Sequence, residues 1–373
     1  TAAFPDSRLH ELAARTNALI SNNSWNYTTP GYDLAAARYD AATRDALPGQ
    51  PGSQPLLFVF AAGNAGDGTQ EGDGGESNSI LSPGTAKNVI TVGAIEQWRE
   101  ITNEVRICRT VEGEEVCTTN APFQPESDSQ SQVAWFSSRG NTGLRAEKEF
   151  GRFKPDVVAP GTWVVSARSQ QWDTNQYFSP TNYLTDADVN QIAEPDQLKT
   201  YRVRLRENAV ALQVEVVPNE GSPVPFPQLP VLLRQDSPPT PEAFDATGLN
   251  SVSTAVTGDS LWFYGVHNVT TQSVAYDIVV TMVTTNDLGD EYEVRARLND
   301  ELGPWYRYET GTSMAAAHVS GTLALMQEFF EQRLSLTNSP ALMKALLING
   351  ARPLGYPYDF QTQKYENHQG WGL

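Results

Sequence analysis

The first half of the chain combines two periods of hydrophobic and polar residues. Apolar residues recur at helical spacing over residues 6–19 and 33–47, which predicts two amphipathic helices. Continuous apolar runs at residues 56–61 and 89–93 are typical of strands that are buried on both faces. Helices that alternate with such strands predict an α/β fold with a doubly wound, mostly parallel sheet. Shorter strands are expected at residues 18–21, 157–159 and 163–167.

The pattern changes over residues 178–302, where the helical period is absent. Apolar and polar residues alternate there in short runs such as 201–205 and 212–216, and Pro-rich turns separate the runs. Short strands with frequent turns predict an antiparallel β-sandwich.

Helical spacing returns near the end of the chain. Residues 313–333 predict one long helix, and residues 340–349 predict another. The sequence is therefore expected to form an α/β domain from residues 1–177 and 303–373, with a β-sandwich domain inserted at residues 178–302.

Composition and charge narrow the classes of function. The chain has 373 residues, of which 39% are hydrophobic, so it can bury a sizeable core. Its formal net charge of −18 opposes binding to nucleic acid or to an anionic membrane, because both are negatively charged. No apolar run approaches the ~20 residues that span a bilayer. The chain begins at Thr1 without a basic and apolar leader and stops at Leu373, and we expect it to be a piece of a longer protein.

Cys108 and Cys117 are the two cysteines, and they stand nine positions apart. Two hairpin arms would bring them together as a disulfide, which suits an oxidising compartment. Two free cysteines are the alternative interpretation, and two residues do not make a metal site.

Ser313 lies between small residues at the start of an apolar, helix-forming run, Gly-Thr-Ser-Met-Ala-Ala-Ala-His-Val-Ser-Gly at residues 311–321. A helix N-terminus presents backbone N–H groups and the positive end of the dipole, which favours developing negative charge. Small neighbours let a substrate carbonyl approach closely. Ser313 is therefore a candidate nucleophile, and a serine nucleophile needs a base.

Several further segments carry short motifs. They are Leu-Ile-Ser-Asn-Asn-Ser-Trp (19–25), Phe-Val-Phe-Ala-Ala-Gly-Asn (58–64), Ser-Pro-Gly-Thr-Ala-Lys-Asn-Val-Ile-Thr-Val-Gly-Ala (82–94), Phe-Ser-Ser-Arg-Gly (136–140), Lys-Pro-Asp-Val-Val-Ala-Pro-Gly (154–161) and Gln-Gly-Trp-Gly (369–372). In this order, and with the Ser313 motif, they resemble the subtilisin-like serine peptidases, or subtilases. The Asn-Ser-Trp and Pro-Gly-Thr-Ala-Lys-Asn segments are most similar to the alkaline, oxidatively stable branch. The resemblance covers residues 5–172 and 305–373.

The resemblance implies a role for two of these residues in catalysis. Ser313 would be the nucleophile that forms the acyl-enzyme. Asn64 would donate its side-chain amide to the oxyanion, together with the backbone N–H of Ser313. Asn64 also suits an ordinary turn after a strand, because Gly-Asn is favourable turn chemistry.

Two extended segments would flank the substrate and line its specificity pocket. They contribute Ser24, Trp25, Asn26, Ala62 and Gly63. The small residues of the second segment leave room for large apolar side chains. The family usually has Gly where Asn26 stands, and Trp25 suits a core position equally well. The Ser82–Pro83 turn resembles one near the pocket floor with a cis bond, although an ordinary loop would also fit.

The catalytic base is absent from these motifs. In the family it comes from a His-Gly-Thr-His type segment, oriented by an Asp of an Asp-Ser/Thr-Gly segment, and this sequence contains neither. His10 lies in a predicted surface helix, His267 in the inserted region and His368 near the end of the chain. His318 stands five residues after Ser313, about 500° further around one helix, so it is expected to point to another face and to pack there. We therefore expect the Asp and the His to lie in upstream sequence.

The resemblance predicts a secreted serine endopeptidase that cleaves proteins or peptides, of which this chain is a fragment without its Asp and His. Such an enzyme requires no cofactor. Calcium is a candidate structural ion, because subtilases often bind it and the acidic, glycine-rich loop at residues 67–76 carries carboxylates that suit Ca²⁺. A solvated loop without a metal is the other interpretation.

Two other functions stay open at this point. The chain could be a catalytically inactive, subtilase-like binding or scaffold protein, or the β-sandwich could itself bind a carbohydrate or a protein. For a peptidase, we expect the insertion to shape the access of protein substrates, because it ends shortly before Ser313.

Overall fold

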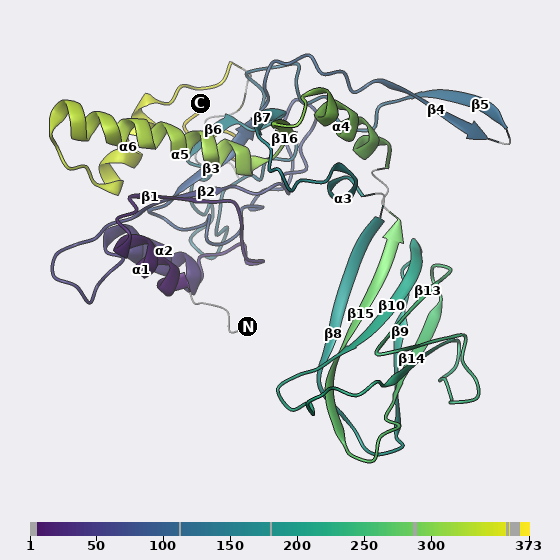
Figure 1. Ribbon diagram of the computed structural model, residues 1–373. Helices are drawn as coiled ribbons and strands as arrows, with labels where there is room; N and C mark the ends of the chain where they lie inside the picture. The colour runs from purple at the N-terminus through teal and green to yellow at the C-terminus, as the bar shows by residue number, and fades with distance from the viewer. Residues whose placement is uncertain (1–5, 112, 180, 286–288, 356–357, 359–365) are drawn as a thin grey trace. The chain divides into compact units, whose positions relative to one another are not determined.

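The computed structural model describes residues 6–111, 113–179, 181–285, 289–355, 358 and 366–373 (Figure 1). The chain forms two compact units. The first unit consists of Thr1–Gln171 and Arg297–Leu373, and the second unit of Trp172–Ala296. The second unit begins and ends six residues before the β domain expected from the sequence, at 172 against 178 and at 296 against 302.

A four-stranded parallel sheet is the centre of the first unit (Figure 1). Its strands, in spatial order, are β1 (Ile20–Asn23), β2 (Leu57–Ala61), β3 (Ile90–Ile95) and β6 (Val157–Pro160). Every residue of β2 and β3 is buried, which explains why their sequences are apolar except for Thr91, whose hydroxyl donates to Gly84 O. The predicted α/β fold with a parallel sheet is therefore confirmed for this unit.

Helices cover both faces of this sheet. They are α1 (Asp6–Arg15), α2 (Leu34–Arg44), α5 (Thr312–Phe329) and α6 (Pro340–Gly350). Successive side chains of β2 point to opposite faces, so Phe58 packs with the core residues of α2 while Val59 packs with those of α5. Side-chain oxygens cap two helices, since Asp33 accepts from Ala36 N ahead of α2 and Ser339 accepts from Leu342 N ahead of α6.

Two helical predictions need correction. The helix expected over residues 313–333 ends as α5 at Phe329 and continues as a π-helical turn, Phe330–Leu334. The second correction is α4 (Gly289–Glu301), which lies in the stretch where no helix was expected. Within α4, Val294 is the one buried apolar residue. The sequence of this helix therefore shows almost no helical repeat of apolar positions, and the helix could not be predicted from it. The remaining helix, α3 (Thr174–Tyr177), is a single turn.

The second unit consists of two antiparallel four-stranded sheets. One has the order β13 (Ser251–Ala255), β10 (Ala209–Val217), β15 (Val274–Thr285) and β8 (Thr181–Ala193), and the other has the order β12 (Ala246–Leu249), β11 (Pro230–Gln235), β14 (Leu261–His267) and β9 (Leu198–Arg204). Residues of both sheets form one hydrophobic core, which includes Leu212 and Tyr276 from the first sheet and Leu233 and Tyr264 from the second.

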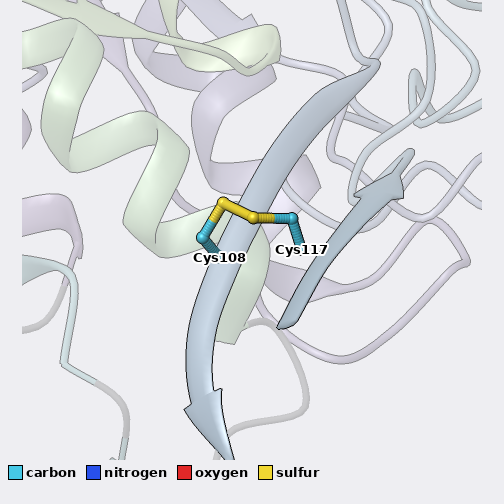
Figure 2. Close-up of a disulfide and its surroundings, with 2 residues drawn as sticks. All are labelled: Cys108 and Cys117. Carbon is cyan, nitrogen blue, oxygen red and sulfur yellow. A yellow bond between two sulfur atoms is a disulfide. The ribbon is translucent and has the colours of Figure 1, made fainter. Parts of the chain in front are cut away.

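Two short pairs of strands complete the first unit. The strands β7 (Val164–Ala167) and β16 (Tyr306–Glu309) pair antiparallel. The strands β4 (Val105–Val111) and β5 (Glu114–Asn120) form a hairpin in which Cys108 stands opposite Cys117. Figure 2 shows the disulfide that joins these cysteines. Of the two interpretations of Cys108 and Cys117, the disulfide is therefore confirmed and the pair of free cysteines is not. Glu115 lies beside the bridge, but sulfurs bonded to each other are not thiolate ligands, so this group is no metal site.

Replacing Cys108 and Cys117 together by Ser is expected to loosen the hairpin while the rest of the fold stays intact. The chain-entropy model gives a closed loop of about ten residues a stabilisation of about 2.7 kcal/mol. Amide hydrogen exchange over residues 105–120 should therefore accelerate by up to about 100-fold. Because β4 and β5 pair only with each other among the described strands, the thermal midpoint should move by less than ~2 °C. A much larger fall in the midpoint would contradict this picture of a peripheral hairpin.

Candidate active site

The carboxyl ends of the parallel strands meet the N-terminus of α5. Gly311 N donates to Gly161 O at 2.7 Å, and Gly161 N donates to Ile95 O at 2.9 Å, which ties the start of α5 to the ends of β6 and β3. Ser313 is the second residue of α5 and is partly exposed. Its hydroxyl therefore lies where helix N–H groups face outward and the dipole favours negative charge.

Asn64 follows β2 and reaches the same helix end. Its Oδ1 accepts two hydrogen bonds from Thr312, one from the backbone N at 3.0 Å and one from Oγ1 at 2.9 Å. Because the carboxamide oxygen is held in this way, the Nδ2 group is the end that stays available to another acceptor. Gly311 precedes Thr312 with a φ of +153°, a backbone conformation that residues with a side chain rarely adopt, so glycine is favoured at the start of this helix.

Thr312 is a site residue that the sequence reasoning missed. Its side chain is 1% exposed, and Oγ1 donates to Asn64 while it accepts from Gly63 N at 3.0 Å. The Thr312 hydroxyl therefore fixes both the Asn64 side chain and the backbone of Gly63, the residue before it. The one sequence signal for Thr312 was its position beside Ser313. Its hydrogen-bond partners lie about 250 residues away in the chain, so the sequence did not reveal them.

The predicted substrate segments lie at this helix end as well. Ser24 Oγ is 3.5 Å from Ser313 O, at the outer limit of a hydrogen bond. Ala62 is buried and donates from its N to Val92 O, while Asn26 is exposed. The bond between Ser82 and Pro83 is cis, and Ser82 O accepts from the backbone N of Tyr27 at 2.7 Å.

The Trp25 side chain has a mixed environment. Its ring is 36% exposed and packs edge-on against the rings of Tyr27 at 5.3 Å and Phe60 at 5.7 Å. One face of the indole thus belongs to the aromatic core above β2, and the remainder is open to solvent.

The four histidines, all within the described residues, are engaged away from Ser313. His318 Nδ1 lies 2.8 Å from Pro160 O on another face of α5. His267 Nε2 is 3.4 Å from Asp196 in the second unit, and His368 Nε2 is 3.1 Å from Gly74 O. In the described part of the chain, the hydroxyl of Ser313 has no hydrogen-bond partner.

His10 corrects one expectation, because its helix is not a surface helix at this position. The imidazole is 4% exposed and packs against Tyr39 at 4.3 Å and Phe58 at 5.0 Å. Burial lowers the pKa of His10 below its usual value, although Asp6 partly offsets the effect. The side chain is thus a neutral core residue at physiological pH.

The acidic, glycine-rich loop at residues 67–76 surrounds a side chain of the protein itself. Arg139 is fully buried, and its guanidinium donates to Ser137 O at 2.9 Å and to Gly72 O at 2.6 Å. A Cβ at Gly68 would lie 2.1 Å from Arg139 Nη2, so a side chain there would have to displace the buried guanidinium. Burial lowers the pKa of Arg139 to about 10, which leaves it charged at neutral pH.

A serine hydroxyl at a helix N-terminus, with a side-chain amide held by the preceding residue, is compatible with the chemistry of a serine hydrolase. Comparison with known proteins gives the family. The model of the subtilase family matches residues 6–188 and 255–372, so the chain belongs to the subtilase family.

No helix among the described residues is both long and apolar enough to cross a membrane.

Curated relatives include two larger proteins. The chain is 31% identical over 137 residues to the serine protease AprX of Bacillus subtilis, and 30% identical over 214 residues to the serine protease/ABC transporter B family protein tagD of Dictyostelium discoideum. These matches cover 36% and 45% of this chain but only 22% and 11% of the relatives. A solved lanthipeptide protease covers 98% of this chain and is itself covered to 63%, with 13% identity and a TM-score of 0.37.

Replacing Thr312 by Val should lower the free energy of unfolding of the chain by about 1–3 kcal/mol, because it removes the acceptor of the Gly63 N–H. Thr322→Val, on the same helix, is the matched control. Its Oγ1 bonds the carbonyl of His318 within the helix and the residue is exposed, so the change should stay within about 0.5 kcal/mol. Urea denaturation measures both variants, and equal effects would show that the Thr312 contacts are not structural.

Proposed function

We propose that the complete protein is a secreted serine endopeptidase in which Ser313 attacks the peptide carbonyl and becomes acylated. The observation that carries this proposal is the contact between Asn64 and Thr312. It holds the amide oxygen of Asn64 on the residue that precedes Ser313, so the Nδ2 group stays available to an acceptor. A donor fixed before the reaction stabilises an oxyanion without reorganisation, and so favours the transition state over the ground state.

The backbone of α5 supplies a second donor for the oxyanion. Thr312 N donates to Asn64 Oδ1, and Met314 N donates to Gly311 O at 3.1 Å. Among the described residues, no acceptor engages Ser313 N, which lies between them. Two free donors of different origin, Asn64 Nδ2 and Ser313 N, can therefore converge on one oxygen.

The base that activates Ser313, and the Asp that orients it, would lie in upstream sequence outside this chain. Two surfaces of the first unit support this proposal. The strand β1 is at the edge of the parallel sheet, where a further strand can pair with it. Leu325 and Phe329 of α5 are 69% and 54% exposed, and such apolar surface suits burial by a further part of the domain.

Substrate preference follows from the small residues at the proposed pocket. Ala62 and Gly63 leave room for large apolar side chains, and Ser24, Trp25 and Asn26 would form the opposite wall. The substrates would be proteins or peptides, and the motifs favour the alkaline, oxidatively stable branch of the family. The chemistry of Ser313 and Asn64 needs no cofactor.

The second unit, which we interpret as an inserted β-sandwich, would control the access of protein substrates. Its chain leaves the first unit after β7 and returns ahead of β16, and these two strands pair with each other. Glu309, the last residue of β16, precedes Ser313 by four positions. An insertion anchored so close to the nucleophile can affect which substrates reach it.

In the full-length protein, Asn64→Leu should lower kcat by about 10²–10³ and leave KM nearly unchanged, a magnitude whose reference case is itself a subtilisin. The expected cause is the loss of a donor that acts on the transition state alone. Asn182→Leu, at an exposed position of β8, is the matched control and should retain full activity. Steady-state hydrolysis of a chromogenic peptide measures both. A rise in KM at constant kcat would instead make Asn64 a substrate-binding residue.

The 373-residue chain alone should hydrolyse the same peptide slowly. A subtilisin without its triad keeps only about 10³–10⁴ over the uncatalysed rate, from binding and oxyanion stabilisation. The full-length protein should exceed this by several orders of magnitude. Normal turnover by the isolated chain would place the base within it. Equally slow turnover by the full-length protein would favour the alternative, a catalytically inactive binding or scaffold protein.

A further inference from the structure

The Phe-Ser-Ser-Arg-Gly motif at residues 136–140 carries three buried polar side chains that the proposed chemistry does not use. Ser137, Ser138 and Arg139 each have an exposed fraction of 0%. Burying polar groups of this kind is unfavourable unless hydrogen bonds satisfy them. The partners of these side chains therefore indicate what the motif does in the structure.

The motif lies alongside the loop that follows β2 and carries Asn64. Gly66 N donates to Phe136 O at 2.8 Å, and Gly68 N donates to Trp135 O at 2.9 Å. These two backbone hydrogen bonds fix the part of the loop just beyond Asn64 to the motif.

Ser138 bonds the two residues that flank Asn64. Its backbone N donates to Gly63 O at 2.8 Å, and its Oγ accepts from Ala65 N at 3.1 Å. Gly63 lies directly against the same hydroxyl, since a Cβ there would be 2.9 Å from Ser138 Oγ. One buried serine thus fixes the backbone immediately before and immediately after Asn64.

The contacts of Thr312 do not by themselves determine where Asn64 Nδ2 lies. Thr312 holds Asn64 Oδ1 and Gly63 N. A carboxamide held only at its oxygen can still pivot if the backbone that carries it moves, and Asn64 is an exposed loop residue. Fixing Nδ2 therefore requires that the main chain on both sides of Asn64 be fixed as well, which is what Ser138 does.

We propose that Ser138 is a positioning residue that aims the oxyanion donor Asn64 Nδ2 before the reaction begins. This inference rests on the proposed role of Asn64 in catalysis. Catalytic groups have to be held within about 0.5 Å of their productive position, and a displacement of about 1 Å can lower the rate about 100-fold. Because Ser138 is buried, its effect on catalysis has to pass through Asn64.

Ser137 provides a matched control within the same motif. It is equally buried, and its Oγ accepts from the backbone N of Ala94 in β3 at 3.0 Å. The two hydroxyls accept the same kind of hydrogen bond, but that of Ser137 anchors the central sheet rather than the loop with Asn64. Because Ala94 is buried and Ala65 is exposed, Ser137→Ala should lose at least as much stability as Ser138→Ala.

In the full-length protein, Ser138→Ala should lower kcat about tenfold and leave KM nearly unchanged, because a misplaced donor stabilises the transition state less well. Ser137→Ala should keep the kcat of the wild type in spite of its lower stability. Steady-state hydrolysis of a chromogenic peptide, at a temperature where all variants are folded, measures both.

A double variant shows whether Ser138 acts through Asn64. Adding Ser138→Ala to Asn64→Leu should cause no further fall in kcat, since the donor to be positioned is already absent. A further tenfold fall in the double variant would overturn the proposal. So would a wild-type kcat in Ser138→Ala, or an equal fall in Ser137→Ala, which would show a general loosening of the fold.

Amide hydrogen exchange separates this inference from the proposed function. Exchange at Ala65 N should accelerate in Ser138→Ala but not in Ser137→Ala, whether or not the protein is active. A full-length protein without activity would contradict the proposed peptidase. Exchange then decides alone: acceleration supports the anchoring of the main chain around Asn64, and unchanged exchange overturns it. If Ser138→Ala does not fold, Ser138→Cys, whose sulfur is a weak acceptor, gives the same comparison.

Discussion

The close packing of α5 against the parallel sheet is the constraint on which the rest of the first unit depends. Ala315 and Ala316 are fully buried against it, and their small side chains let the helix axis lie near the strands. This packing brings the first turn of α5 to the carboxyl ends of the strands, where parallel strands commonly place binding groups. Gly311 then reaches Gly161, and Thr312 reaches Asn64, through hydrogen bonds of 2.7–3.0 Å.

Buried charges stabilise the loops around this packed centre. Asp156 Oδ2 accepts from Lys154 Nζ at 2.6 Å, and its Oδ1 lies 2.8 Å from Lys344 Nζ, so one carboxylate joins the start of β6 to α6. Burial alone would raise the pKa of Asp156, but the two ammonium groups keep it below its usual value. Arg139 acts similarly for the glycine-rich loop, where carbonyl oxygens surround a guanidinium. The carboxylates of Asp73 and Asp67 provide negative charge near this guanidinium.

The sequence predicted those features that local pattern controls. The buried strand β2 is apolar throughout and β3 is apolar except for Thr91, and the motif around Ser313 identified the start of α5. Features that depend on distant contacts were not predictable. Thr312 acts through partners about 250 residues away, and Arg139 gives the acidic loop an internal cation that its own sequence does not reveal. The helix α4 was missed because Val294 alone supplies a buried apolar position.

The three loops that follow β2, β3 and β6 have different chemistry, although they leave the same edge of the sheet. The loop after β2 supplies Asn64, whose amide is fixed by hydrogen bonds at its oxygen. The loop after β6 supplies Gly161, whose backbone alone bonds both neighbours. The loop after β3 supplies Glu96, which stays without a hydrogen bond among the described residues. Burial raises the pKa of this carboxyl group to about 9, so a proton neutralises it at physiological pH, whereas hydrogen bonds satisfy the groups of the other two loops that reach α5.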